Sequence, residues 1–213
     1  MMIDGATVLR FPWPSVERQR LGVAFGMWTF LASEILFFGG LFLSYAVYRS
    51  LYPQAFAVAS HATSMFYGTI NTALLLTSSF VMTLALHASK KRARALVVSC
   101  LLLTAAFGLA FLAVKGLEYA EDIDKGLIPG PGFTLEPDTT RLFFALYWVM
   151  TGIHAIHLAI GVALVVYLGA ALLSERMATE SPAVEATSLY WHFVDSIWLV
   201  LYALIYLPGR HAP

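Results

Sequence analysis

The side chains most able to take part in chemistry lie inside long apolar stretches. Glu34 is the only acidic or basic residue between Leu21 and Tyr48, in the segment LASEILFFGG. A carboxylate at membrane depth is costly unless it is paired, protonated or turned towards protein. We therefore expect Glu34 to have a partner or to carry a proton.

Two histidines are candidates for that partner. His154 and His157 lie in MTGIHAIHLAIG, one turn after Thr151, and a spacing of three residues predicts that both imidazoles share a helix face. By rise per residue, His157 and Glu34 lie roughly 24 Å and roughly 20 Å from the same side, so one of the histidines is predicted to contact Glu34. Paired histidines also bind metal or haem. Di-metal bundles supply several glutamates, however, so we expect no metal ligand and no catalytic residue here.

Two further ionisable pairs follow helical spacing. His192 and Asp195 are one turn apart in YWHFVDSIWL. Asp195 needs a partner, for which His192, a tyrosine hydroxyl or a helix of another subunit are the alternatives. In KGLEYAED, Lys115 and Glu118 are three apart, which predicts an ordinary ion pair at a helix end, with a lysine that can snorkel.

The remaining intramembrane polar residues indicate helix packing. Asn71 and Thr72 are expected to form an interhelical hydrogen bond worth about 1 kcal/mol. A stripe of small residues at helical spacings, typical of surfaces along which membrane helices approach closely, runs beside Glu34: Gly26, Ser33, Gly40 and Ser44.

Composition defines the elements that position these residues. Hydrophobic residues make up 59% of the chain and charged residues 12%, with a mean hydropathy of +0.74, which is typical of a polytopic membrane protein. We predict an all-α fold with five transmembrane helices, the fourth being the longest. Their expected ranges are 21–48, 66–88, 95–117, 141–173 and 188–207, within a bundle of residues 21–213.

Residues 1–20 are predicted to form a cytoplasmic or interfacial segment. Phe11 and Trp13 resemble membrane-interface anchors, and a disordered tail is the alternative. The first apolar run is too long for a cleavable signal peptide. Zero net charge gives no reason to expect nucleic-acid binding. The single cysteine, Cys100, excludes an internal disulfide and a cysteine zinc site.

Basic residues predict the orientation. Most lie on the side that includes the N-terminus and the KKRAR turn at residues 90–94. The positive-inside rule therefore places the N-terminus in the cytoplasm and the C-terminus outside.

Taken together, several short motifs resemble subunit III of the haem–copper respiratory oxidases, the cytochrome c oxidase polypeptide III family. The resemblance extends from Gly22 onward and rests on SE-x-x-FF, an NT pair, an EY pair, TG-x-H-x-x-H and YWHFVD followed by Trp198. The residues that carry it are Ser33, Glu34, Phe37, Phe38, Asn71, Thr72, Glu118, Tyr119, Thr151, Gly152, His154 and His157.

Two departures from the family pattern are visible. Many members have seven spans, with a lipid-filled cleft after the first two, whereas five are predicted here. Lys115 stands where many relatives have Gln. Short forms are also similar to subunit III of ubiquinol oxidases and to an accessory protein of nitric oxide reductases.

The resemblance implies a subunit without redox chemistry of its own in a bacterial cytoplasmic membrane. Haem and copper would belong to partner subunits, with subunit I as the main contact and subunit II and a small subunit IV as further neighbours. Phospholipid binding and support of proton uptake and turnover stability are implied, with Glu34 and a histidine in the polar core and Asp195 and His192 near proton entry. A small proton-coupled carrier using Glu34 and the histidines, and a metal-binding membrane enzyme, are the alternatives from other classes.

Overall fold

The computed structural model describes residues 13–208, and this part of the chain is helical, without strands. Five helices are long and apolar enough to cross a membrane, so the predicted all-α fold with five such helices is confirmed. The sixth is the short helix α2. The helices are α1 Val16–Leu51, α2 Pro53–Ala62, α3 Met65–Lys90, α4 Arg94–Asp124, α5 Thr140–Leu173 and α6 Pro182–Ile205.

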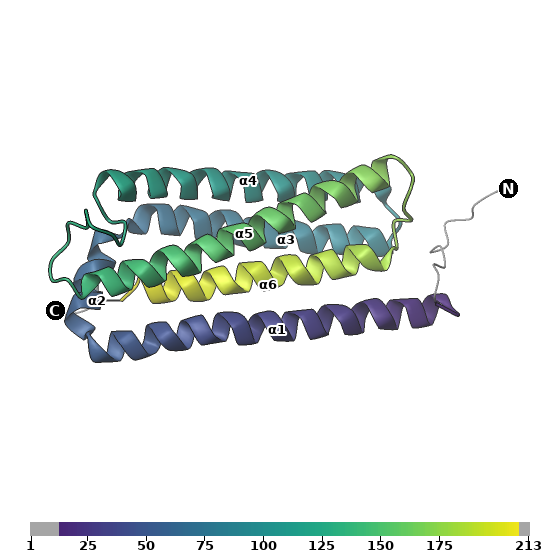
Figure 1. The fold of residues 1–213 in the computed structure, drawn as a ribbon. Helices are drawn as coiled ribbons and strands as arrows, with labels where there is room; N and C mark the ends of the chain where they lie inside the picture. The colour runs from purple at the N-terminus through teal and green to yellow at the C-terminus, as the bar shows by residue number, and fades with distance from the viewer. Residues whose placement is uncertain (1–12, 209–213) are drawn as a thin grey trace.

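Four of the long helices form a bundle, and the fifth lies against its outside. Helices α3, α4, α5 and α6 contact one another in a ring, whereas α1 packs on α5 and α6. Figure 1 shows α5 crossing the bundle obliquely and α2 lying across one end. We call this end the α2 end, and the end at which α1 begins the opposite end.

Caps and turns explain most differences from the predicted helix ranges. Helix α1 begins at Val16 instead of residue 21, because the Ser15 hydroxyl accepts a hydrogen bond from the Arg18 N–H at 3.2 Å. Helix α4 runs to Asp124 instead of 117. It ends where Gly126 adopts a φ of +68°, a conformation that glycine reaches without strain.

The last predicted helix, 188–207, in fact begins at Pro182 and ends at Ile205, because Ser181 caps it with proline at the first helical position. The fourth predicted helix is not the longest, since α1 has 36 residues and α5 has 34. Helix α2 was not predicted, because its 10 residues are too few for a membrane span.

The predicted interfacial segment is described only in part. Phe11 lies outside the described residues, as do the other residues before Trp13. Trp13 is exposed, and its ring lies against Gly22. Residues 16–20 belong to α1. The division at residue 20 stays a prediction.

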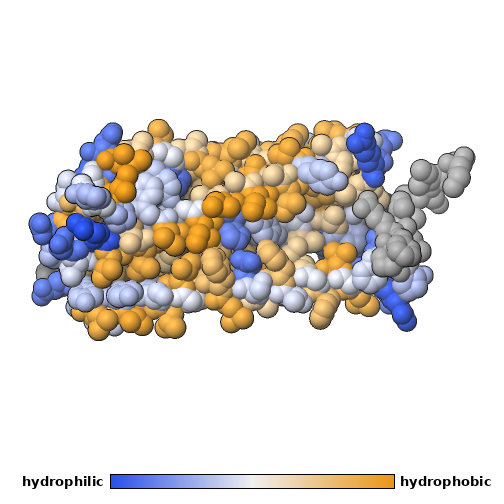
Figure 2. Space-filling model, in the orientation of Figure 1, coloured by the Kyte–Doolittle hydropathy of each residue, from blue (hydrophilic) through white to orange (hydrophobic). Residues whose placement is uncertain are grey.

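The surface matches a bilayer in the arrangement of its side chains. Figure 2 shows hydrophobic side chains over the middle of the bundle and hydrophilic ones gathered at its two ends. Large exposed side chains such as Phe25, Leu36 and Phe80 are 65–78% exposed. Such a broad apolar surface suits hydrocarbon rather than water.

Trp191 on α6 is closely packed inside the bundle. The indole is fully buried between Gly108 of α4 and Gly161 of α5. A Cβ atom added at Gly108 would lie 2.6 Å from Val162 Cγ2 and 2.8 Å from Trp191 Cη2. Both glycines therefore make room for one large ring.

We expect Gly108→Ala to destabilise the bundle by about 1–3 kcal/mol, since the new methyl group overpacks the Trp191 site. Gly116→Ala on the same helix is the matched control, because a Cβ there meets no atom within 4 Å. Thermal unfolding of the two variants in the same detergent measures the difference. Equal melting temperatures would contradict the packing argument.

Candidate functional site

The structure brings Glu34 of α1 beside His157 of α5. The two side chains are 18% and 17% exposed, and His157 Nε2 lies 3.2 Å from Glu34 Oε2. Glu34 is near the middle of α1, about 26 Å from either helix end by rise per residue. Figure 2 shows a hydrophilic spot between α5 and α1 in the otherwise apolar middle of this face.

The hydrogen-bond partners of His157 fix how many protons the pair holds. His157 Nδ1 lies 2.9 Å from the carbonyl oxygen of Ile153. A carbonyl only accepts, so Nδ1 carries a hydrogen, and in a neutral imidazole Nε2 then carries none. With both contacts made as hydrogen bonds, the hydrogen between Nε2 and Oε2 would come from a protonated Glu34 or from a doubly protonated His157. In either arrangement the pair would be neutral overall and share one proton.

Two aromatic residues contact His157, one at its ring and one at its backbone. The Phe38 ring meets it edge-on, with ring centroids 5.3 Å apart. The Tyr190 hydroxyl of α6 donates to the His157 carbonyl oxygen at 2.9 Å. The sequence analysis did not single out Tyr190, because a tyrosine among apolar residues carries no distinctive spacing.

An apolar groove of about 580 Å³ adjoins the pair. It lies between α1, α5 and α6, and Figure 2 shows a hollow beside the hydrophilic spot. Apart from Glu34 and His157, its walls are mostly apolar: Val23, Met27, Phe30, Ile160, Leu164, Ala183, Ala186, Thr187 and Tyr190. The neutral pair thus faces a space that suits hydrocarbon.

His154 does not share this site. It is 1% exposed and lies inside the bundle, with its ring centroid 5.6 Å from that of Phe111 and 5.2 Å from that of Trp198. Neither ring nitrogen forms a hydrogen bond with a described residue. The two histidines lie one turn apart on α5, but their rings meet different neighbours: His154 contacts Trp198 inside the bundle, and His157 contacts Glu34 of α1.

His192 and Asp195 also diverge. The His192 ring turns to α3, where its Nδ1 lies 2.7 Å from the Ser79 hydroxyl. Asp195 is 5% exposed, and neither carboxylate oxygen has a hydrogen bond of standard geometry within residues 13–208. The Ser79 side chain is next to Asp195, but its single hydrogen is shared with the His192 contact. Neither His192 nor a tyrosine hydroxyl therefore bonds to Asp195, and a helix of another subunit stays a prediction.

The predicted packing residues behave differently from one another. Thr72 joins two helices, because the Trp198 indole donates to its hydroxyl at 3.0 Å. The fully buried Asn71 forms no side-chain hydrogen bond with a described residue. The Ser33 hydroxyl donates to the Phe30 carbonyl of its own helix at 2.6 Å. The small-residue stripe is open, since a Cβ at Gly26 or Gly40 meets nothing within 4 Å.

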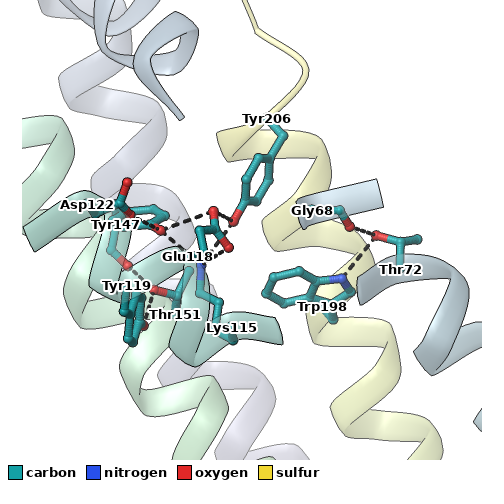
Figure 3. Close-up of polar contacts among 10 residues, drawn as sticks. All are labelled: Gly68, Thr72, Lys115, Glu118, Tyr119, Asp122, Tyr147, Thr151, Trp198 and Tyr206. Carbon is teal, nitrogen blue, oxygen red and sulfur yellow. Dashed lines mark hydrogen bonds and ion pairs between the residues drawn. The ribbon is translucent and has the colours of Figure 1, made fainter. Parts of the chain in front are cut away.

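A fully buried ionic network lies near the α2 end. Lys115 Nζ donates to Glu118 Oε2 at 2.9 Å and to the hydroxyls of Tyr147 and Tyr206 at 3.0 Å each. Tyr206 donates to Glu118 Oε1 at 2.7 Å, and Tyr147 donates to Asp122 Oδ2 at 2.7 Å. Figure 3 shows the ammonium group among these oxygens.

This network corrects the expected helix-end pair. The Lys115 and Glu118 side chains are only 2% and 1% exposed, so the lysine does not snorkel to a surface. Beside them, Tyr119 of α4 contacts the Thr151 hydroxyl of α5 at 2.7 Å. Asp122 was missed because the predicted helix ended at 117, although its spacing of seven from Lys115 places it on the same face.

We expect Lys115→Met to cost about 3–5 kcal/mol, because it leaves the Glu118 carboxylate buried without its counter-charge. The matched control is Lys125→Met, which breaks the exposed Lys125–Glu121 pair and should cost about 1 kcal/mol or less. Thermal unfolding in detergent compares them. The double variant Lys115→Met/Glu118→Gln should recover part of the loss, and a harmless Lys115→Met would refute a structural role.

No group of three or more potential metal ligands comes together within residues 13–208. The arrangement is that of a multi-pass helical membrane protein, with one neutral acid–imidazole pair beside an apolar groove and one enclosed ionic network. These features define the class of multi-pass helical membrane proteins with polar residues inside the bundle.

Comparison with known proteins identifies the family. Residues 15–210 match the family model of cytochrome c oxidase subunit III. The chain is 34% identical over 188 residues to "cytochrome c oxidase subunit 3" of Synechocystis sp. The aligned region covers 86% of this chain and 74% of that protein. It is 36% identical over 189 residues to the protein of the same name in Thermostichus vulcanus, covering 87% of each.

A further relative is the "heme-copper oxidase subunit I+III" of Aeropyrum pernix, 30% identical over 192 residues, or 85% of this chain and 22% of that protein. The chain therefore belongs to the cytochrome c oxidase subunit III family and is part of a terminal oxidase complex. The family resemblance predicted from the sequence motifs is confirmed.

Proposed function

We propose that this chain is the non-redox third subunit of its oxidase and that it packs mainly on subunit I. The relative from Aeropyrum pernix supports the contact, since its printed name joins subunits I and III. Subunit II and a small subunit IV are the further neighbours we propose. The proposed location is a bacterial cytoplasmic membrane with the N-terminus in the cytoplasm, in accord with the basic KKRAR turn. Haem and copper are assigned to the partner subunits.

We propose that the Glu34–His157 pair supports proton uptake and turnover stability. The observation that carries this proposal is the proton count, because the pair requires one shared hydrogen between Nε2 and Oε2. A neutral pair is tolerated at mid-membrane depth, where an unpaired carboxylate is costly. In this proposal the shared proton makes the pair a proton store beside the groove.

The groove beside the pair is proposed to hold the acyl chain of a phospholipid. Its volume of about 580 Å³ lies within the range of small-molecule sites. Its walls from α1, α5 and α6 are almost entirely apolar. Placing the methylene groups of an acyl chain there is favourable. Because the chain comes from a bilayer, the favourable free energy comes mainly from closer packing.

Glu34→Gln should leave the initial oxidase rate nearly unchanged and lower sustained turnover severalfold. The amide N–H of the glutamine still donates to His157 Nε2, so the geometry is kept while the exchangeable proton is lost. The measurements are turnover before inactivation, protons taken up per electron, and the infrared band of a protonated carboxyl in the purified complex.

The control for this experiment is His87→Gln, which removes an exposed imidazole near the end of α3. This variant should behave as the wild type. Unchanged turnover, proton stoichiometry and infrared spectrum in Glu34→Gln would leave the pair with a packing role only.

Filling the groove should displace lipid. Ala186→Phe places a ring in the groove wall, and we expect the purified complex to retain less phospholipid, measured by mass spectrometry of the extract. Leu109→Phe, on the exposed face of α4, is the control and should retain the wild-type amount. Equal lipid content in both variants would argue against an acyl chain at this position.

A further inference from the structure

One acid in the buried network near the α2 end has no positively charged partner. Asp122 is 2% exposed. Within residues 13–208 its only side-chain hydrogen bond comes from the Tyr147 hydroxyl, which lies 2.7 Å from Oδ2. None of the ion pairs in this part of the chain includes Asp122. Figure 3 shows it at the edge of the network.

The positive charge of the network is matched by the other buried acid, Glu118. Lys115 Nζ donates to Glu118 Oε2 at 2.9 Å, and the Tyr206 hydroxyl donates to Oε1 at 2.7 Å. The other two hydrogens of the ammonium group point to tyrosine hydroxyls, so none is directed at Asp122. If both acids were ionised, one lysine and two carboxylates would leave one negative charge in excess.

The remaining charged groups near Asp122 do not balance that excess. Lys125 follows three residues later, but its Nζ lies 2.6 Å from Glu121 Oε1, and these two side chains are 47% and 40% exposed. On α3, the Tyr67 hydroxyl is turned to Glu121. The titratable groups around Asp122 come from α4, α5 and the end of α6: Lys115, Glu118, Tyr119, Lys125, Tyr147 and Tyr206.

A buried carboxylate without a counter-charge is costly, and such a group becomes neutral by holding a proton. The Tyr147 hydroxyl lies 2.7 Å from Asp122 Oδ2 and 3.2 Å from Glu118 Oε1, and it has one hydrogen for both. Two carboxylates that share one site repel each other when both are ionised. Glu118 has the ammonium group beside it, so Asp122 is the acid that takes the proton.

We propose that Asp122 is a proton-binding site and that its proton completes the ionic network at the α2 end. With Asp122 neutral, the network holds one cation and one anion. When Asp122 loses its proton, one unbalanced negative charge remains between α4, α5 and the segment after α6, and their packing weakens. The site does not rest on the proposed function. Only the side of the membrane that supplies the proton, the outside, rests on the proposed orientation.

A proton held at Asp122 makes the stability of the chain depend on pH. In the unfolded chain an aspartate is ionised above about pH 5, whereas Asp122 in the folded chain keeps its proton. Unfolding then releases one proton. The unfolding equilibrium constant therefore rises with pH by up to about tenfold per pH unit, until Asp122 ionises in the folded chain as well.

The test compares thermal unfolding of the full chain and its Asp122→Asn variant in one detergent at about pH 5, about pH 7 and about pH 9. The amide oxygen of asparagine still accepts from Tyr147, but the side chain cannot ionise. We expect the two proteins to melt alike at the lowest pH and the variant to melt higher at the highest pH. Asp124→Asn, at an exposed acid of the same helix, is the matched control and should follow the wild type throughout.

A second measurement is the infrared band of protonated carboxyl groups at neutral pH. Part of this band should be lost in Asp122→Asn and kept in Asp124→Asn. Asp122→Ser, which is also uncharged, replaces the asparagine variant if that protein does not fold. The same pH dependence in wild type and Asp122 variant, or an unchanged carboxyl band, would overturn the proposal. Failure of the wild-type chain to co-purify with other oxidase subunits would refute the proposed function and leave this site unaffected.

Discussion

The structure depends on one constraint, the high cost of an uncompensated charge in hydrocarbon. The chain meets it in two ways. Near the middle of the membrane, Glu34 and His157 lie within hydrogen-bond distance of each other. Near the α2 end, the Lys115 ammonium group donates to a carboxylate and to two tyrosine hydroxyls. The Glu34–His157 pair is partly exposed at a groove, whereas the Lys115 network is fully buried.

This difference in exposure suits the Lys115 network to a role in stability and the Glu34–His157 pair to a role in function. A network whose members are 0–2% exposed is rigid, since each hydrogen bond fixes the next. The Glu34 and His157 side chains are 17–18% exposed and line the apolar groove. Helix α1 also lies outside the ring of α3 to α6. The pair is therefore the single described polar link at membrane depth that holds α1 to α5.

Sequence reasoning found the elements that hydropathy and helical period control. Five spans, the depth of Glu34 and its approach to a histidine of α5 all follow from counting residues along helices. The pairings that failed depend on the direction in which a side chain leaves its helix. His154 and His157 are three residues apart, yet one meets Trp198 and the other Glu34, because α5 crosses its neighbours obliquely. Asp122 was not predicted as a site residue, because the predicted helix ended at residue 117 and α4 runs to Asp124.

The polar residues left without partners follow the same physical rule. Within residues 13–208, the side chains of Asn71, Thr104 and Ser188 are buried without a hydrogen bond. They belong to α3, α4 and α6, three helices of the ring. In a water-soluble domain such groups would signal a poor fold. Here they are uncharged amide and hydroxyl groups, and burying such a group without a hydrogen bond costs far less than burying an unpaired charge.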